Sequence, residues 1–372
     1  MASGFSLKDQ LFNQQKTRYL AGLFAPVVPG FQADQFETDV MAGLLPLELK
    51  ARISWIAEVL GQHLPGPLPE VAPRLLQALP PPLDPGRTDD DFGDFIFAPV
   101  GEFVLARGLH SDPELALDLL AELTQRFSME WAIRPFLNTH QDLTLARMQQ
   151  WIQHPSYHVR RLVSEGTRPR LPWGQGVALT LADPLPFLDH LHQDPTRYVT
   201  RSVANHLNDI SKKEPDLVLD RLEAWRAHGA QQEKELTWLI SHACRGLVKS
   251  GHPRALRLLG YDPEAEVSVD LQLGASALRI GGALKFEVTL ASPTDLPVIV
   301  DYRVSFARAG GKTAQKVFKL KQTKLRGAAL TLAKLHRFKG DATTFKLYPG
   351  RHQIEILVNG RVGAQAAFDL TA

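Results

Sequence analysis

A helix predicted from Pro155 to Glu165 ends on a residue that could do chemistry. Proline suits the first position of a helix, and Gly166 can adopt the left-handed conformation that closes one. Glu165 therefore lies in the last turn, where the negative end of the helix dipole disfavours a carboxylate. A carboxylate kept there at a cost in stability suggests a function. The spacing is equally compatible with a solvated glutamate that pairs with Arg161 or Arg168.

A rigid basic loop follows this helix, from Arg168 to Gly174, with the sequence RPRLPWG. Its two prolines fix φ, so Arg168, Arg170 and Trp173 are presented with little conformational freedom left to lose. Guanidinium groups beside an aromatic ring suit a nucleic-acid backbone and its stacked bases. A structural alternative stays open, in which Trp173 fills the space between two helices.

The run SEGTRPRLPWG, from Ser164 to Gly174, resembles the signature of the AlkC-type DNA alkylation-repair glycosylases. These enzymes are built from HEAT-like helical repeats. Two further segments are similar to the same family, Phe127–Phe136 and Val203–Ser211. The resemblance covers roughly residues 5 to 260, and a long motif so rich in Pro, Trp and Arg is a specific one.

The resemblance implies an activity, the release of bases methylated at N3, chiefly 3-methyladenine and 3-methylcytosine. Such a base is already positively charged, so its glycosidic bond is weak and the base departs neutral. The enzyme must then stabilise the cationic sugar and position a water molecule, which carboxylates can do and an aromatic ring can assist. The resemblance assigns these catalytic roles to Glu165, Trp173, Glu130 and Asp209.

Two of these acids have simpler explanations. Glu130 follows Ser128, which can cap a helix, and an acid in a first turn is favourable. Asp209 could be a satisfied surface residue. Three acids that fall in three family-like segments nevertheless favour a catalytic role.

Basic residues around these motifs are candidates for phosphate contacts, which position a duplex without reading its sequence. They are Arg160, Arg161, Arg168, Arg170, Arg201, Lys212, Lys213 and Arg245. Two or three of them are expected to be only solvated, with Lys212 and Lys213 first among these. The resemblance also implies that the damaged base is not fully flipped into a pocket.

The composition excludes several classes of protein. Hydrophobic residues make up 44% and charged residues 22%, as in soluble globular proteins, and no apolar run approaches 18 residues. The N-terminus lacks the order of a signal peptide, so we expect a cytoplasmic protein without a membrane segment. The single cysteine, Cys244, excludes an internal disulfide and is expected to be buried. His154 and His158 are helical neighbours without a third ligand, and no nucleotide-binding motif is present, so we expect neither metal nor cofactor.

Positive charge collects toward the C-terminus. The net charge is −8 for residues 1–154, +3 for residues 155–263 and +7 for residues 264–372. Between Arg303 and Lys339 there are eleven Lys or Arg residues and no acid. A basic run without interspersed acids is typical of a surface that meets a polyanion.

The elements that must position these residues read as helices through residue 263. Apolar residues at helical spacing predict helices over Leu44–Leu60 and Pro113–Gln125, with a short helix over Val71–Leu79 between them. A repeat is visible at a period of 40, because Pro155–Val163 aligns with Pro195–Val203. This period suits stacked HEAT-type helical pairs, which would place Arg161 and Arg201 along one surface.

After residue 263 the pattern changes to alternating apolar and polar residues, which predicts strands. The predicted strands are Val267–Leu273, Leu284–Leu290, a run from Pro297 to Val304, Gln315–Leu320, Ala329–Leu335, His352–Val358 and Ala366–Leu370. Seven short strands in this length indicate an immunoglobulin-like sandwich without the cysteine pair of antibody domains. Some AlkC-type proteins carry such a C-terminal domain.

The sequence therefore predicts a mainly α protein, with a HEAT-like α-solenoid in residues 1–263 and a small immunoglobulin-like β-sandwich in residues 264–372. We expect a monomeric, monofunctional DNA glycosylase for base excision repair, acting on double-stranded DNA that contains alkylated bases, with the sandwich as a DNA clamp. The alternative is a non-catalytic HEAT-repeat scaffold that binds DNA or a protein.

Overall fold

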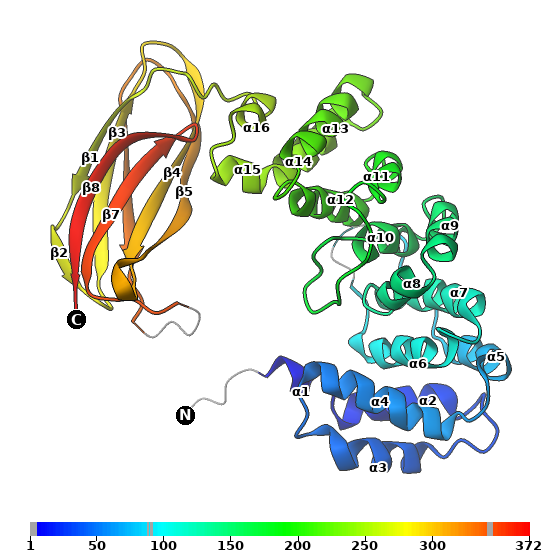
Figure 1. Ribbon diagram of the computed structural model, residues 1–372. Helices are drawn as coiled ribbons and strands as arrows, with labels where there is room; N and C mark the ends of the chain where they lie inside the picture. The colour runs from blue at the N-terminus through cyan, green and yellow to red at the C-terminus, as the bar shows by residue number, and fades with distance from the viewer. Residues whose placement is uncertain (1–5, 88, 90–91, 341–344) are drawn as a thin grey trace. The chain divides into compact units, whose positions relative to one another are not determined.

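The computed structural model describes residues 6–87, 89, 92–340 and 345–372 (Figure 1). Helices come first along the chain and strands follow, as the sequence predicts. The chain forms two compact units, Met1–Ile210 with His228–Leu239, and Ser211–Ala227 with Ile240–Ala372. The last helix ends at Leu258 and the first strand begins at Ser268, on either side of the boundary predicted at residue 263.

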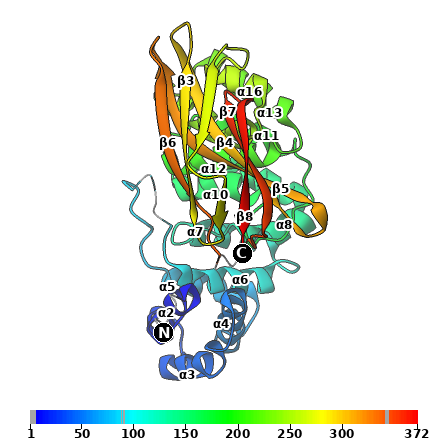
Figure 2. The same ribbon diagram turned by 90° about the vertical axis from the view of Figure 1, so that its left-hand side faces the viewer.

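Short α-helices make up the first unit (Figures 1 and 2). They are α1 (Leu7–Leu11), α2 (Gln14–Phe24), α3 (Ala33–Leu44), α4 (Leu49–His63), α5 (Leu68–Ala78), α6 (Ala98–Gly108), α7 (Pro113–Thr124), α8 (Ile133–Thr139), α9 (Gln141–Trp151), α10 (Tyr157–Gly166), α11 (Leu185–Leu191) and α12 (Arg197–Ile210). A 3₁₀ turn, Phe95–Phe97, precedes α6. Helices α13 (Pro215–His228) and α14 (Glu233–Ala243) each have residues in both units, and α15 (Arg245–Lys249) and α16 (Pro253–Leu258) belong to the second.

Apolar stripes bury these helices against their neighbours. Helix α4 buries Ile53, Ile56 and Leu60 at helical spacing, and it packs on α3 and α6. Its predicted start at Leu44 is wrong, because α3 ends at that residue and a turn separates the two helices. The predictions for α5 and α7 agree with the structure to within a few residues. Among the described residues, no helix is both long and apolar enough to cross a membrane.

The 40-residue repeat corresponds to α10 and α12, which pack against each other. Helix α10 begins at Tyr157 after Ser156, two residues later than predicted. The guanidinium groups of Arg161 and Arg201 both lie over the ring of Tyr198, at 4.4 Å and 5.8 Å from its centre. The two arginines therefore share one aromatic ring, but Arg161 is only 11% exposed, so they do not line an open surface as predicted.

The strands of the second unit form a two-sheet sandwich, with sheet orders β1-β3-β6 and β2-β8-β7-β4-β5 (Figure 1). The strands are β1 (Ser268–Leu273), β2 (Ala277–Arg279), β3 (Ala283–Ala291), β4 (Leu296–Ala307), β5 (Thr313–Leu325), β6 (Leu330–Arg337), β7 (Gly350–Val358) and β8 (Arg361–Thr371). Side chains from both sheets, including Phe286, Tyr302 and Ile356, share one apolar core. The predicted sandwich is confirmed, but the sequence analysis missed β2.

The sandwich and α16 pack together within the second unit. Leu256 and Tyr261 form a small buried cluster with Ile299, on the outer face of β4. Asn359 accepts a hydrogen bond from the Ile299 amide at 2.9 Å and donates one to the Asp262 carbonyl at 2.9 Å. This face of β4 is therefore covered rather than solvated.

Candidate active site

The predicted catalytic acids come together in one buried group within the first unit. We call it the acid–arginine cluster, and it consists of Glu130, Arg161, Glu165, Arg168 and Asp209. Helix α10 supplies Arg161 and Glu165, α12 supplies Asp209, and Glu130 lies just before α8. Acids and arginines alternate through the cluster, so each arginine contacts two carboxylates.

Glu165 occupies the centre of the cluster. Its Oε1 accepts a hydrogen bond from Arg168 Nη1 at 2.5 Å, and its Oε2 accepts one from Ser202 Oγ at 2.6 Å. Arg161 Nη2 lies 3.7 Å from the same Oε2 atom. Both carboxylate oxygens are thus held in place by Ser202 of α12 and by Arg161 and Arg168.

The outer acids complete the pattern. Arg161 Nη1 donates to Glu130 Oε2 at 2.9 Å, and Ser128 Oγ donates to the same oxygen at 2.8 Å. Arg168 donates to Asp209 Oδ2 through Nη2 at 2.7 Å and through Nε at 3.0 Å. Asp209 is 7% exposed and belongs to this cluster, so it is not the surface acid of the simpler explanation.

Glu165 is buried, with 4% of its surface exposed, yet the cluster keeps it ionised. Burial opposes the charge, but Arg161, Arg168 and the Ser202 hydroxyl outweigh burial and lower the pKa of Glu165. Burial likewise opposes the charge of Arg168, and Glu165 and Asp209 outweigh it and raise the pKa of that arginine. The alternative of a solvated glutamate is therefore wrong, because Glu165 pairs with both arginines away from water.

Arg134 holds the end of α10, and the sequence analysis did not assign it a role. Its side chain is fully buried, and Nη1 donates to the carbonyls of Gly166 at 2.8 Å and Arg168 at 3.0 Å. Its Nε donates to the Gln175 carbonyl at 2.5 Å. Burial, and then the charge of Arg168, lowers the pKa of Arg134 to about 10, so the guanidinium stays charged at neutral pH. The sequence feature that could have indicated a buried role is the position of Arg134 beside Ile133, in an otherwise apolar stretch.

Gly166 serves the site differently from the prediction. It lies inside α10 and does not adopt the left-handed conformation. A Cβ atom at this position would lie 2.7 Å from the Cγ2 atom of Ile133, so glycine allows α10 to approach α8 closely. The carbonyl end of α10 is satisfied by Arg134 instead of a glycine cap.

Trp173 lies on the surface, in the loop that follows α10. It is 54% exposed and its φ is 63°, a left-handed conformation that costs a residue with a side chain about 1–2 kcal/mol. Its ring lies 6.1 Å from the ring of Trp131, whose Nε1 donates to the Pro172 carbonyl at 3.3 Å. The alternative in which Trp173 fills a space between helices is therefore wrong.

Three of the arginines predicted to contact phosphate are engaged inside the protein. Arg160 is bonded to both carboxylate oxygens of Asp194, at 2.5 Å and 3.2 Å, and to the carbonyl of His154. Arg161 and Arg168 belong to the acid–arginine cluster, with 11% and 12% of their side chains exposed. The structure therefore shows these three arginines as ion-paired, and phosphate contact by them stays a prediction.

The remaining basic candidates differ in exposure. Arg170 is exposed in the rigid loop, and Arg201 pairs with Asp89 at 2.6 Å. Lys212 and Lys213 are exposed and Arg245 is half-buried, and these three belong to the second unit. Phosphate contact by these five residues stays a prediction.

No group of three His, Cys, Asp or Glu side chains arranged to hold a metal ion occurs in the described part of the chain. His154 Nδ1 accepts a hydrogen bond from the Ser156 amide, and the ring of His158 lies 4.1 Å from that of Tyr157. Cys244 is buried, as predicted.

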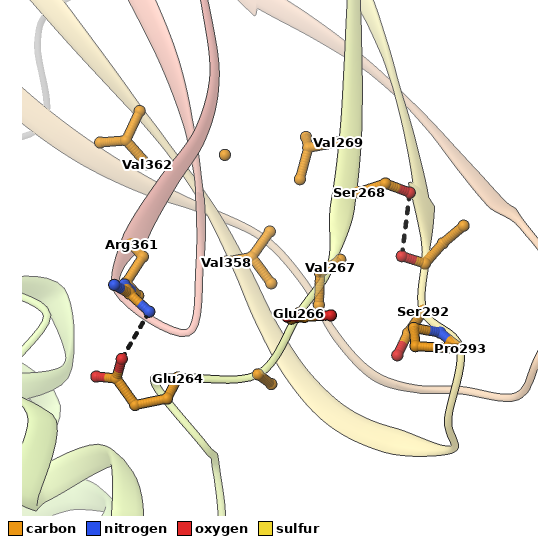
Figure 3. A pocket seen from close by; sticks show the side chains of 13 residues that line it. Glu264, Glu266, Val267, Ser268, Val269, Ser292, Pro293, Val358, Arg361 and Val362 are labelled. Carbon is orange, nitrogen blue, oxygen red and sulfur yellow. Dashed lines mark hydrogen bonds and ion pairs between the residues drawn. The ribbon is translucent and has the colours of Figure 1, made fainter.

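A cavity with a volume of about 710 Å³ lies in the second unit, against β1 and the β7–β8 turn (Figure 3). Its lining is mostly small and apolar. Arg361 donates to Glu264 at 2.8 Å, and this pair is well exposed. None of the predicted catalytic residues lines this cavity.

Comparison with known proteins assigns the whole chain. A protein family described as the uncharacterised protein YhaZ, C-terminal Ig-like domain, matches residues 267–372. The solved structure of Pseudomonas fluorescens alkylpurine DNA glycosylase AlkC, bound to DNA containing an abasic site analog, is 35% identical and has a TM-score of 0.86. The match covers 99% of this chain and 100% of that one. The chain belongs to the AlkC family. The chain is also similar to the uncharacterized protein YhaZ of Bacillus subtilis (strain 168). The two are 39% identical over 254 residues, which span 67% of this chain and 70% of YhaZ.

We predict that Arg134→Met releases the loop that follows α10. Three carbonyls, of which that of Gly166 is buried, would lose their donor, so the free energy of unfolding should fall by about 3 kcal/mol or more. Chemical denaturation followed by circular dichroism measures this change. The exposed Arg170→Met is the matched control and should change stability by no more than about 0.5 kcal/mol. Equal stability of the two variants would contradict the role given to Arg134.

Proposed function

We propose that this AlkC family member is a monofunctional DNA glycosylase that hydrolyses the N-glycosidic bond of N3-alkylated bases, 3-methyladenine and 3-methylcytosine, in duplex DNA. This reaction is the first step of base excision repair. The observation that carries the proposal is the carboxylate of Glu165, which is buried and paired with both Arg161 and Arg168, with a further acid beyond each arginine. The similar AlkC of Pseudomonas fluorescens is an alkylpurine DNA glycosylase, and we extend that activity to this chain.

The chemistry needs a negative charge more than it needs a proton donor. When the bond between the sugar and an N3-alkylated base breaks, its electron pair moves to the base, which leaves without charge. The sugar is left as an oxocarbenium ion, and a carboxylate fixed in a site of low dielectric stabilises it strongly. Glu165, which is already ionised and needs no rearrangement, fits that role.

Water completes the reaction. A water molecule attacks the anomeric carbon of the cation and gives its proton to a carboxylate of the cluster, where Asp209 and Glu130 flank Glu165. Arg161 and Arg168 form ion pairs with these acids, and a guanidinium does not supply the amine nucleophile that a covalent sugar intermediate requires. We therefore propose a monofunctional enzyme, in which water is the nucleophile. Because one chain supplies the whole cluster, we also propose that the enzyme is a monomer.

The alternative of a non-catalytic HEAT-repeat scaffold is less favourable. A scaffold would bury three carboxylates and two arginines at an energetic cost without a task for them. DNA contact is better assigned to exposed groups. In the first unit these are Arg170 and Trp173, and in the sandwich they are the basic residues of β5 and β6. Phosphate contacts of this kind would position duplex DNA without reading its sequence.

We predict that Glu165→Gln reduces base release sharply while DNA binding stays nearly intact. The amide keeps the shape of the side chain but removes the charge that stabilises the cationic transition state. Loss of such a partner typically costs on the order of 3–4 kcal/mol, or roughly 100–1000-fold in rate. Release of 3-methyladenine from methylated duplex DNA under single-turnover conditions measures the effect.

A matched control comes from the same unit. Glu235 accepts hydrogen bonds from Arg197 and Thr200, so it is also an ion-paired carboxylate of the solenoid, but it lies outside the cluster. Glu235→Gln should release base at the wild-type rate. A wild-type rate in Glu165→Gln would exclude Glu165 from catalysis, and no release by the wild-type protein would refute the proposed function.

We predict that the basic run of the sandwich contributes affinity rather than chemistry. Lys321, Lys334 and Lys339 are exposed. Changing all three to Gln should weaken duplex binding and lower the salt dependence by roughly one unit for each phosphate that these lysines neutralise. Single-turnover release at saturating protein should be unchanged. Substitution is preferable to deletion of residues 264–372, because deletion would expose the cluster that α16 forms with β4.

The control for this experiment is Lys50→Gln, which removes an exposed lysine from the acidic N-terminal region. It should leave both the affinity and the slope unchanged. If the triple variant has the wild-type salt dependence, the basic run serves another partner and the sandwich does not clamp DNA.

A further inference from the structure

A cavity in the first unit borders the acid–arginine cluster. Its volume is about 220 Å³, and we call it the aromatic pocket. It is lined by Phe92, Phe95, Phe127, Ser128, Glu130, Trp131, Arg161 and Tyr198. Five of these eight side chains are aromatic, and the other three belong to or contact the cluster.

The aromatic rings form two groups. Phe95 and Phe127 are 4.4 Å apart, and Trp131 lies 6.4 Å from each of them. Phe92 and Tyr198 form the second group, with their ring centres 5.5 Å apart. Any of the nucleobases can stack on such rings, because each of them has a π face.

The polar edge of the pocket is built as firmly as its rings. Glu130 accepts hydrogen bonds from Arg161 and Ser128, so its carboxylate is fixed in position. Arg161 stacks on Tyr198 at 4.4 Å. Burial raises the pKa of Tyr198 to about 12, so this wall carries a neutral phenol at physiological pH. The pocket therefore offers stacking faces together with one ordered acceptor.

Size limits what can enter. An apolar cavity of about 150 Å³ accommodates a benzene molecule, whereas drug-sized ligands occupy about 300–1000 Å³. A pocket of about 220 Å³ falls between these values and suits a molecule of one or two fused rings. A nucleobase meets this limit, and a nucleotide with its sugar and phosphate exceeds it.

We propose that the aromatic pocket takes the free alkylated base once it has left the sugar, and that it holds the base as a product beside the cluster. This inference rests on the proposed function, because it needs a base to be released at Glu165. Arg161 links the two sites, since it contacts Glu165 on one side and lines the pocket on the other. The base does not have to be flipped into the pocket before the bond breaks.

Equilibrium dialysis of the full-length protein with free 3-methyladenine tests this inference. Wild-type protein should bind the base, and Phe95→Leu should weaken binding at least about fivefold, the weaker limit of base–aromatic stacking. Phe92→Ala should weaken it as well, and this residue is 49% exposed, so its removal does not threaten folding. Phe318→Leu removes a ring of the sandwich and should leave the affinity unchanged, and melting temperatures verify that each variant is folded.

The outcomes separate the pocket from the proposed function. Absent binding to the wild-type protein, or equal affinity in the wild-type protein and both pocket variants, would overturn the pocket as a base site. Base release from methylated DNA is measured on the same preparations. Release without pocket binding refutes only this inference. Pocket binding without release refutes the glycosylase and the product role together, and leaves a pocket that binds a base without producing one.

Discussion

The rest of the site depends on the ion pairs that the buried carboxylate of Glu165 forms with two arginines. Burying a charge is unfavourable unless partners and hydrogen bonds offset the loss of water. Arg161, Arg168 and Ser202 provide that offset, and they come from α10, the following loop and α12. The ion pairs and hydrogen bond of Glu165 therefore connect neighbouring repeats. Removing one partner from such a buried group costs about 3–5 kcal/mol, so these contacts also stabilise the packing of the repeats.

Repetition of the helical pairs explains how these groups reach one another. Helices α10 and α12 are equivalent elements 40 residues apart and pack against each other, so Ser202 of α12 reaches Glu165 of α10. Arg168 then reaches from the end of α10 to Asp209 near the end of α12. Arg134 of α8 holds the same loop from the other side. The cluster draws on the segment before α8, on α10 with its following loop and on α12, and its hydrogen bonds fix the side chains in position. Charges fixed in this way meet the condition for electrostatic catalysis.

Local patterns predicted much of this structure. The alternation of β1, β3 and β4 and the stripes of α4 and α7 are local signals, and Glu165 and Trp173 lie in one motif. Strand β2 has three residues, too few to show alternation. Spacing allowed Arg161 and Arg168 to pair with Glu165, but their second partners, Glu130 and Asp209, lie far away in the chain and could not be predicted from it. The aromatic pocket joins Phe92 to Tyr198 through tertiary packing alone.

The ionisation of Glu165 in the folded protein tests the central claim most directly. A ¹³C NMR titration of glutamate-labelled protein, with Glu165→Gln to assign the resonance, reports the charge of this carboxylate. Our account predicts that Glu165 stays ionised from neutral pH down to below the ordinary glutamate pKa of about 4.3, because Arg161 and Arg168 favour the charge. A carboxyl group that is protonated at neutral pH would contradict the account, since a neutral acid cannot stabilise a cationic sugar.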